Sequence, residues 1–237
     1  NNPITGSTPA TASDDVEVQS GTAVLSGELI ANNLTVDAGA ILEMAAPTST
    51  AALSILNLAG DITNNGNIMF KSDANGSAQL EEFSGTISGS GDVEVQRFIP
   101  AGDNNSRAFR FLSTAVDSNG TIFDDWQEGG TSPTGFGTHI TGTDLGTGLG
   151  FDDSGSGNPS LLLFDNVLQS WSSIPNTNST NLEAGNAYNL FVRGDRTIDL
   201  FPTGSTNPPP KNTTLRSTGT LATGSLTTGT EILALAS

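Results

Sequence analysis

Oxygen-rich turns are the first feature of this sequence that could do chemistry. Carboxylate and amide oxygens fall on tight turns in three segments: DANGS (73–77), DSNGT (117–121) and FDDSGSGN (151–158). Ca²⁺ takes about six to eight such oxygens from flexible loops. We therefore predict a calcium site with Asp152, Asp153 and Asn158 as ligands. Two observations favour ordinary turns without a metal ion. No segment carries the final Glu of an EF-hand loop, and Asp, Asn and Gly are common turn residues.

Sugar binding is a second possible chemistry, because sugar sites present aromatic faces beside acidic and amide groups. Trp126 lies in FDDWQEGG and is flanked by Asp124 and Asp125. This polar setting predicts an exposed indole, so the three residues are the predicted ligand-binding site. Trp171 and Tyr188 lie in apolar runs that resemble strands, and we expect both in the core.

The sequence contains few of the residue arrangements that enzymes use for catalysis. The only histidine, His139, lies in a Gly- and Thr-rich segment, and no G-x-S-x-G motif surrounds a serine. The chain has no cysteine, which excludes disulfides and a Cys nucleophile. Glycosidases need two carboxylates about 5–10 Å apart across a cleft, whereas neighbours such as Asp124 and Asp125 would point to opposite faces of a strand. We predict that the protein is not an enzyme.

The net charge of the chain indicates which classes of molecule it can bind. The 237 residues include 8 basic and 25 acidic ones, for a net charge of -17. Such a chain repels nucleic acid and anionic lipid, so neither is expected as a partner. It also has no apolar run long enough to insert into a membrane. The acidic surface attracts cations, although it equally serves solubility.

Short strands must position these residues. Between residues 14 and 98 the sequence repeats a unit that consists of a strand, a Gly-containing turn and a second strand. The four units begin at Val16, Leu34, Ile62 and Ile87, in steps of 18, 28 and 25 residues. Alternation of apolar residues within each unit is typical of half-buried strands. Four units at this spacing predict a parallel β-helix, or β-solenoid. An antiparallel sandwich is the alternative.

The turns of these units also carry a prediction. Gly39 lies in DAGA and Gly66 in NNGN. Glycine adopts positive φ at little cost, so we expect both in that conformation, with Asn and Gly stacked between successive coils.

The rest of the chain differs from the repeats. Residues 1–13 are a polar leader, whereas 99–237 contain both Trp, the only Tyr and several strand-like runs separated by Gly-rich segments. We predict a β-sandwich, jelly-roll-like, for 99–237, with RGDR (193–196) as a tight turn between two strands. The sequence stops in GTEILALAS (229–237), just after an apolar run, so we expect this domain to be truncated at its C-terminal end. The whole chain is therefore predicted to be all-β.

A family resemblance covers roughly residues 85–237. The run GSGDVEVQRFIPAGDNNSRAFRFLSTAV (89–116) resembles a segment of large secreted and cell-surface proteins of Bacteroidetes, in which such a strand closes NNG-type solenoid repeats and an RFLS strand opens the next β domain. Further similar segments are FGTHITG (136–142), GNPSLLLFDN (157–166), QSWSSIPNTN (169–178) and YNLFVRGDRTIDL (188–200). The resemblance implies export by the type IX secretion system and an extracellular or outer-membrane surface location. It supplies no catalytic residues.

Together these observations predict a non-catalytic, secreted or cell-surface protein of structural or adhesin type. Its expected partners are the type IX translocon and shuttle proteins during export, and glycans or a host or cell surface afterwards. One alternative is a carbohydrate-binding module of a polysaccharide-utilising system. The other is a polysaccharide-degrading enzyme on the β-helix, which would need basic residues beside clustered Asp, whereas the repeats contain only Lys71 and Arg97.

Overall fold

The computed structural model describes residues 9–82, 84–102, 107–143, 148–202 and 208–223. It confirms the all-β prediction, because these residues contain 19 strands and a single 3-10 turn at Glu128–Gly130. No helix in this part of the chain is long and apolar enough to cross a membrane. The start of the predicted leader and the end that we expected to be truncated lie outside the described residues.

Two compact units make up the fold, dividing between Val93 and Glu94. The division falls within strand β13 (Asp92–Ile99), the strand in which the predicted boundary after residue 98 also lies.

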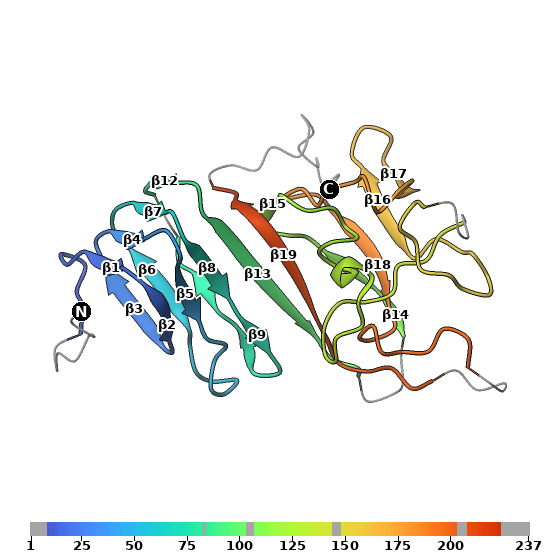
Figure 1. The fold of residues 1–237 in the computed structure, drawn as a ribbon, viewed down its shortest axis with the longest axis horizontal. Coiled ribbons are helices and arrows are strands. Elements are labelled where there is room, and N and C mark those ends of the chain that lie inside the picture. The colour runs from blue at the N-terminus through green and yellow to red at the C-terminus, as the bar shows by residue number, and fades with distance from the viewer. Residues whose placement is uncertain (1–8, 83, 103–106, 144–147, 203–207, 224–237) are drawn as a thin grey trace, which may run out of the picture. The chain divides into compact units, whose positions relative to one another are not determined.

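In the first unit, consecutive strands visit three parallel ladders in turn and then return to the first (Figure 1). The first ladder contains β1 (Val16–Val18), β4 (Leu34–Val36), β7 (Ile62–Asn64) and β12 (Ile87–Ser88). The second contains β2 (Gly21–Leu25), β5 (Ala40–Met44) and β8 (Asn67–Phe70). The third contains β3 (Glu28–Ala31), β6 (Ile55–Leu58) and β11 (Gln79–Leu80). A short hairpin of β9 (Ser72–Asp73) and β10 (Gly76–Ser77) precedes β11.

The register of the first ladder matches the repeat units of the sequence. Val16 pairs with Leu34, Leu34 with Ile62, and Ile62 with Ile87, which are the first residues of the four units. The two strands of one sequence repeat, such as β4 and β5, pair with strands of the neighbouring repeats rather than with each other. Parallel pairing in all three ladders does not fit the antiparallel sandwich that was the alternative for this region.

Burial follows the alternation that the sequence shows. In β5, Ala40, Leu42 and Met44 are buried while the two residues between them are not. Each fully buried large aliphatic side chain contributes about 1.5–3 kcal/mol relative to leaving it in water. In the next repeat Leu42 pairs with Ile68 and Met44 with Phe70, which are also buried, so apolar side chains of successive repeats lie next to each other and stabilise the parallel pairing.

A polar ladder connects the residues that precede the strands of the first sheet. Asp15 Oδ1 accepts hydrogen bonds from the Asn33 N–H and Nδ2, at 3.2 and 2.9 Å. Asn33 Oδ1 accepts one from the Asp61 N–H at 2.7 Å, and Asp61 Oδ1 accepts one from the Thr86 N–H at 2.7 Å. Each of these residues stands immediately before the first strand of its unit, so the ladder repeats with the same register as the strands.

The two turn glycines meet different requirements. Gly39 has φ +79°, as predicted. The prediction for Gly66 is wrong, because Gly66 is absent from the positive-φ residues. A Cβ there would lie 2.3 Å from Ala40 O and 2.5 Å from Asp37 O, so Gly66 is needed for the close approach of two turns of backbone.

The second unit contains two sheets. In one of them β19 (Thr213–Leu221) lies between β15 (Val116–Ser118) and β13. The other is antiparallel and has the order β14 (Ala108–Leu112), β18 (Tyr188–Val192), β16 (Leu161–Asp165), β17 (Ser170–Ser173). A single hydrophobic cluster takes Ile99 and Leu215 from the first sheet and Leu161 and Leu190 from the second. The RGDR prediction is wrong in part, because no strand follows Arg196 directly.

We predict that Gly66→Ala destabilises the first unit by more than 2 kcal/mol, because the added methyl group meets backbone oxygens that cannot move aside. Gly39→Ala is the matched comparison, since its Cβ would meet nothing within 4 Å and only the backbone conformation is strained. That variant should lose about 1 kcal/mol. Urea unfolding followed by circular dichroism measures both, and equal losses would contradict the close-approach explanation.

Candidate functional site

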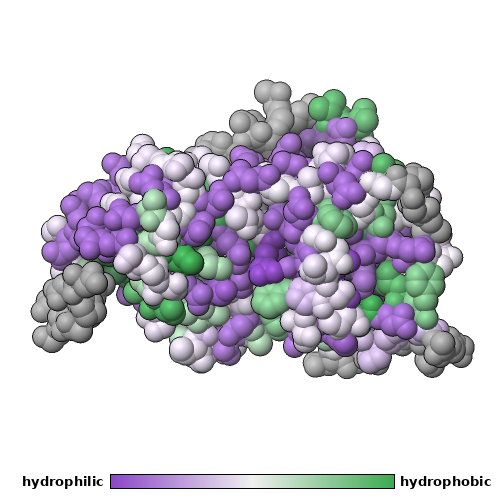
Figure 2. Space-filling view, viewed as in Figure 1, coloured by the Kyte–Doolittle hydropathy of each residue, from purple (hydrophilic) through white to green (hydrophobic). Residues whose placement is uncertain are grey.

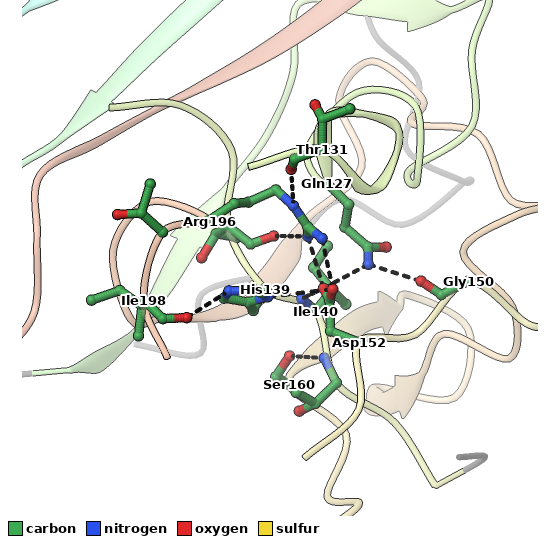
Figure 3. A network of polar contacts seen from close by, with 12 residues as sticks. Gln127, Thr131, His139, Ile140, Gly150, Asp152, Ser160, Arg196 and Ile198 are labelled. Carbon is green, nitrogen blue, oxygen red and sulfur yellow. Dashed lines mark hydrogen bonds and ion pairs between the residues drawn. The ribbon is translucent and has the colours of Figure 1, made fainter. Parts of the chain in front are cut away.

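Asp152 is the centre of a buried polar network in the second unit (Figure 3). Arg196 donates to both of its carboxylate oxygens, from Nη2 to Oδ1 at 2.7 Å and from Nη1 to Oδ2 at 2.9 Å. Gln127 Nε2 and the Ile140 N–H also donate to Oδ2, at 2.8 and 2.9 Å. His139 Nδ1 lies 3.3 Å from Oδ1, close enough for an ion pair.

The other donors of Arg196 are also used inside the protein. Its Nε donates to Thr131 O at 2.6 Å, and its Nη1 donates to Thr138 O at 3.1 Å. The side chain of Arg196 is almost fully buried. This single guanidinium therefore joins its own segment to the positions around residues 131, 138 and 152, all of which lie along the chain between the 3-10 turn at Glu128–Gly130 and strand β16.

The network determines the charge state of Asp152. Burial alone would raise the pKa of this carboxyl, but the neighbouring His139 and Arg196 outweigh burial and hold the pKa well below its usual range. His139 Nε2 contacts the Ile198 carbonyl at 2.9 Å, so both nitrogens of the ring face protein groups. The only histidine is thus placed as a structural residue rather than as a free general base.

The structure gives the three predicted calcium ligands different surroundings. The Asp152 oxygens are occupied by N–H donors, while Asp153 and Asn158 are exposed. The carbonyl of Asn158 accepts a hydrogen bond from Thr141 Oγ1 at 2.8 Å. Among the described residues, no three His, Cys, Asp or Glu side chains form a group that could hold a metal ion. The sequence analysis missed Arg196, whose guanidinium donates two hydrogen bonds to the Asp152 carboxylate.

The two predicted acidic ligand-binding residues have separate structural roles. Asp124 is exposed, and its Oδ2 accepts hydrogen bonds from the N–H and Oγ1 of Thr121, at 2.9 and 2.7 Å, which lower its pKa. Asp125 is buried and accepts a hydrogen bond from Ser118 Oγ. Burial raises the pKa of Asp125 to about 6 in spite of that bond.

Trp126 is buried, so the prediction of an exposed indole is wrong. It is 3% exposed, its Nε1 donates to Ser217 Oγ at 3.2 Å, and its ring meets Tyr188 edge-on with centroids 5.4 Å apart. The polar residues before it are satisfied by Thr121 and Ser118, which leaves the indole free to turn inward. Tyr188 lies in the core as predicted.

Trp171 is the exposed tryptophan, contrary to the prediction that it is in the core. It lies on the edge strand β17 and is 38% exposed. Strand alternation explains this, because Leu161 and Leu163 of the neighbouring strand β16 face the core while Phe164, the residue paired with Trp171, points the other way.

Five rings lie on the outer face of the β14–β18–β16–β17 sheet, which we call the aromatic face: Phe109, Phe111, Phe164, Trp171 and Phe191. Phe109 packs against its cross-strand partner Phe191, with centroids 5.1 Å apart. Trp171 contacts Phe164 at 5.1 Å and Phe111 at 5.7 Å. The rings thus form contacts across all four strands of the sheet.

Comparison with known proteins adds no identity to this site. No family model, curated protein or solved structure matches the chain. The aromatic face and the Asp152 network are therefore interpreted from their geometry. The network is internal and holds loops together, whereas the aromatic face is accessible and is the better candidate for contact with another molecule.

We predict that Arg196→Ala destabilises the second unit by about 3–5 kcal/mol, because it leaves the Asp152 carboxylate buried and uncompensated. Urea unfolding measures this loss. Arg97→Ala is the control, since Arg97 is exposed and belongs to none of the four ion pairs of the described residues, and it should change stability by less than about 0.5 kcal/mol. Equal effects of the two substitutions would contradict the role of the network.

Adjacent carboxyls should change stability with opposite pH dependence. Because the folded-state pKa of Asp125 is raised to about 6 from 3.8, its contribution is greatest below pH 4 and is lost as the pH rises through 6. Asp125→Asn should therefore gain roughly 1–2 kcal/mol relative to wild type between pH 4 and pH 7. The pKa of Asp124 is lowered, so Asp124→Asn should instead lose stability at pH 7 and approach wild type in acid. Thermal unfolding from pH 3 to pH 7 checks both, and parallel profiles would refute this assignment.

Proposed function

We propose that this chain is a non-catalytic, secreted or cell-surface protein of structural or adhesin type. Residues 14–98 would form a parallel β-helix that serves as a rigid spacer, and 99–237 would form a β-sandwich, jelly-roll-like, that contacts other molecules. The observation that carries this proposal is the contrast between internal polar groups and the exposed aromatic face.

The strand pairing supports the spacer. Apart from the β9–β10 hairpin, the described strands of the first unit pair in parallel with the equivalent strands of neighbouring repeats, in all three ladders. A β-helix of this kind needs only its core positions and corners, and its outward positions are free. The repeats contain only two basic residues: Lys71, whose Nζ lies 3.8 Å from Glu43 Oε2, and Arg97, near their end. This is a poor supply of cations for a β-helix enzyme that acts on acidic polysaccharides.

The shared core supports the sandwich. Ile99 and Leu215 belong to one sheet of the second unit and Leu161, Leu190 and Val192 to the other, and all of them lie in one cluster. Two sheets whose inner faces share a core are the basic arrangement of a β-sandwich.

Location and export are proposed from the family resemblance of residues 85–237. We propose that the protein is a cargo of the type IX system, with the translocon and shuttle proteins as export partners, and that it acts outside the cell or attached to the outer membrane. A net charge of -17 suits a dispersed extracellular protein.

A carbohydrate-binding module is the second candidate function, and the aromatic face favours it. The predicted site around Trp126 cannot serve, because its indole is internal. Trp171, Phe109 and Phe111 take its place as exposed aromatic residues.

A single experiment separates the adhesin from an enzyme. The purified chain is incubated with soluble and insoluble polysaccharides, and retention and newly formed reducing or unsaturated ends are both measured. We expect retention on at least one polysaccharide with no product above the level of a heat-inactivated control. Product release would overturn the non-catalytic proposal. In the host bacterium, surface display that persists after loss of the type IX translocon would overturn the export route.

A further inference from the structure

We propose that the aromatic face binds an acidic polysaccharide, whose sugar rings stack on the aromatic side chains and whose carboxylates pair with Arg193 and Arg107. This inference rests on the proposed adhesin function and adds to it a site and a class of ligand. Its support comes from the exposure of the rings, from an unsatisfied amide between them and from two cations at one end.

The exposed rings form a surface that folding alone does not explain. Phe111 is 77% exposed and Phe109 is 46% exposed, although both lie in a regular strand of a sheet whose other face is in the core. A contiguous apolar patch on a soluble protein marks an interaction site. The C–H groups of a sugar ring carry partial positive charge and the face of an aromatic ring is electron-rich, so flat aromatic rings suit sugar rings.

Asn189 adds hydrogen-bonding capacity within the aromatic face. It is paired with Phe111 on one side and with Leu162 on the other, in the centre of the sheet. Its Oδ1 is buried and has no hydrogen-bond partner in the described structure. A buried acceptor without a hydrogen-bond partner destabilises the folded protein. A small movement of the flanking rings would expose the Asn189 Oδ1, which could then accept a hydrogen bond from a sugar hydroxyl.

Arg193 supplies a cation at the end of β18. Its guanidinium lies 4.7 Å from the centroid of the Phe191 ring, and its Nη1 is buried with no hydrogen-bond partner. Ala108 of β14 pairs with Val192 of β18, so Arg107 and Arg193, the residues just beyond this antiparallel pair, lie next to each other at the end of the two strands. Burial lowers the pKa of Arg193, and the positive charge of Arg107 lowers it further. Neither belongs to an ion pair of the described residues.

The local charge identifies the ligand as an anion. Arg193 also lines a small pocket together with Arg110 and Lys211, and no acidic residue lines it. With Arg107, these are four of the eight basic residues in a chain that has 25 acidic ones. A carboxylate would accept two parallel hydrogen bonds from a guanidinium and offset its charge. Arg110 pairs with Leu190 of the core and therefore lies on the other face of the sheet, so Arg193 and Arg107 are the cations at this end of the aromatic face. Two neighbouring cations in an otherwise acidic chain favour an anionic ligand over a neutral one.

The opposite end of the aromatic face is apolar. Figure 2 shows hydrophobic side chains at the tip of the β16–β17 hairpin, where Val167 and Leu168 are 83% and 72% exposed. A second copy of the chain could cover this end, but two chains that each carry a net charge of -17 repel one another. The same charge repels an acidic polysaccharide, and it is Arg193 and Arg107, which belong to no ion pair of the described residues, that offset this repulsion at the aromatic face. Self-association is therefore an outcome of the test rather than the proposal.

Isothermal titration calorimetry of the whole chain tests the proposal, with polygalacturonate as the acidic probe and a neutral xylan of similar length as the comparison. We expect polygalacturonate to bind at least 10-fold more tightly at low salt, with the difference shrinking as salt rises. Trp171→Ala should weaken binding of both probes about 10-fold or more. Arg193→Gln should weaken polygalacturonate binding by a similar factor and leave xylan binding unchanged.

Controls separate binding from folding. Phe201→Ala removes an aromatic side chain that is 55% exposed and lies outside the sheet, and it should bind as wild type does. Arg193→Lys keeps the charge and should recover part of the affinity that Arg193→Gln loses. Circular dichroism and urea unfolding of each variant show whether the fold is retained.

The outcomes distinguish this inference from the proposed function. If Trp171→Ala is retained on polysaccharides as strongly as wild type, the aromatic face is not the binding site, although the adhesin function stands. Equal affinity for acidic and neutral probes would overturn the ligand class. Dimerisation in analytical ultracentrifugation that Trp171→Ala abolishes, without polysaccharide binding, would assign the face to a second copy. Product release would instead refute the non-catalytic function itself.

Discussion

The buried ion pair of Arg196 with Asp152 is the interaction on which the second unit depends. One guanidinium makes two hydrogen bonds to the carboxylate and two more to the backbone carbonyls of Thr131 and Thr138. Little regular secondary structure connects these loops, so their backbone groups are satisfied by side chains instead. The loops in turn place Trp126 against Tyr188 in the core behind β18. The inner face of the sheet is thereby covered, and its aromatic residues are left on the outer face.

The first unit is stabilised in a different way, by repetition. The strands of its three ladders pair in parallel, with the first residues of successive repeats aligned in the first ladder. The residues before the strands of that ladder form the polar ladder through Asp15, Asn33 and Asp61. Gly66 and Gly91 allow successive turns to approach more closely than any side chain permits. No single buried ion pair is needed, because every repeat satisfies the backbone of the next. Such a unit suits a spacer, whereas the loop-rich second unit has the irregular surface that binding requires.

Sequence reasoning identified the strands of the repeats well and the side-chain environments of the second unit poorly. Val16, Leu34, Ile62 and Ile87 were recognisable as equivalent positions because period-2 alternation is a local pattern. Trp126 and Trp171 were assigned to the wrong environments, since flanking polar residues do not show which side chains satisfy them. Arg196 appeared to belong to a surface turn, and its partner Asp152 lies 44 residues away in the chain.

The all-β character, the alignment of the repeats and the acidic charge balance could all be predicted from the sequence, because each depends on residue type and short-range spacing. The pairing of Asp152 with Arg196 and the internal position of Trp126 became known from the three-dimensional contacts alone. The tertiary structure also decided that Phe111 and Trp171, from non-neighbouring strands of one sheet, meet on its outer face. These outcomes depend on contacts between residues far apart in the chain, and no local pattern specifies which distant partner a side chain will find.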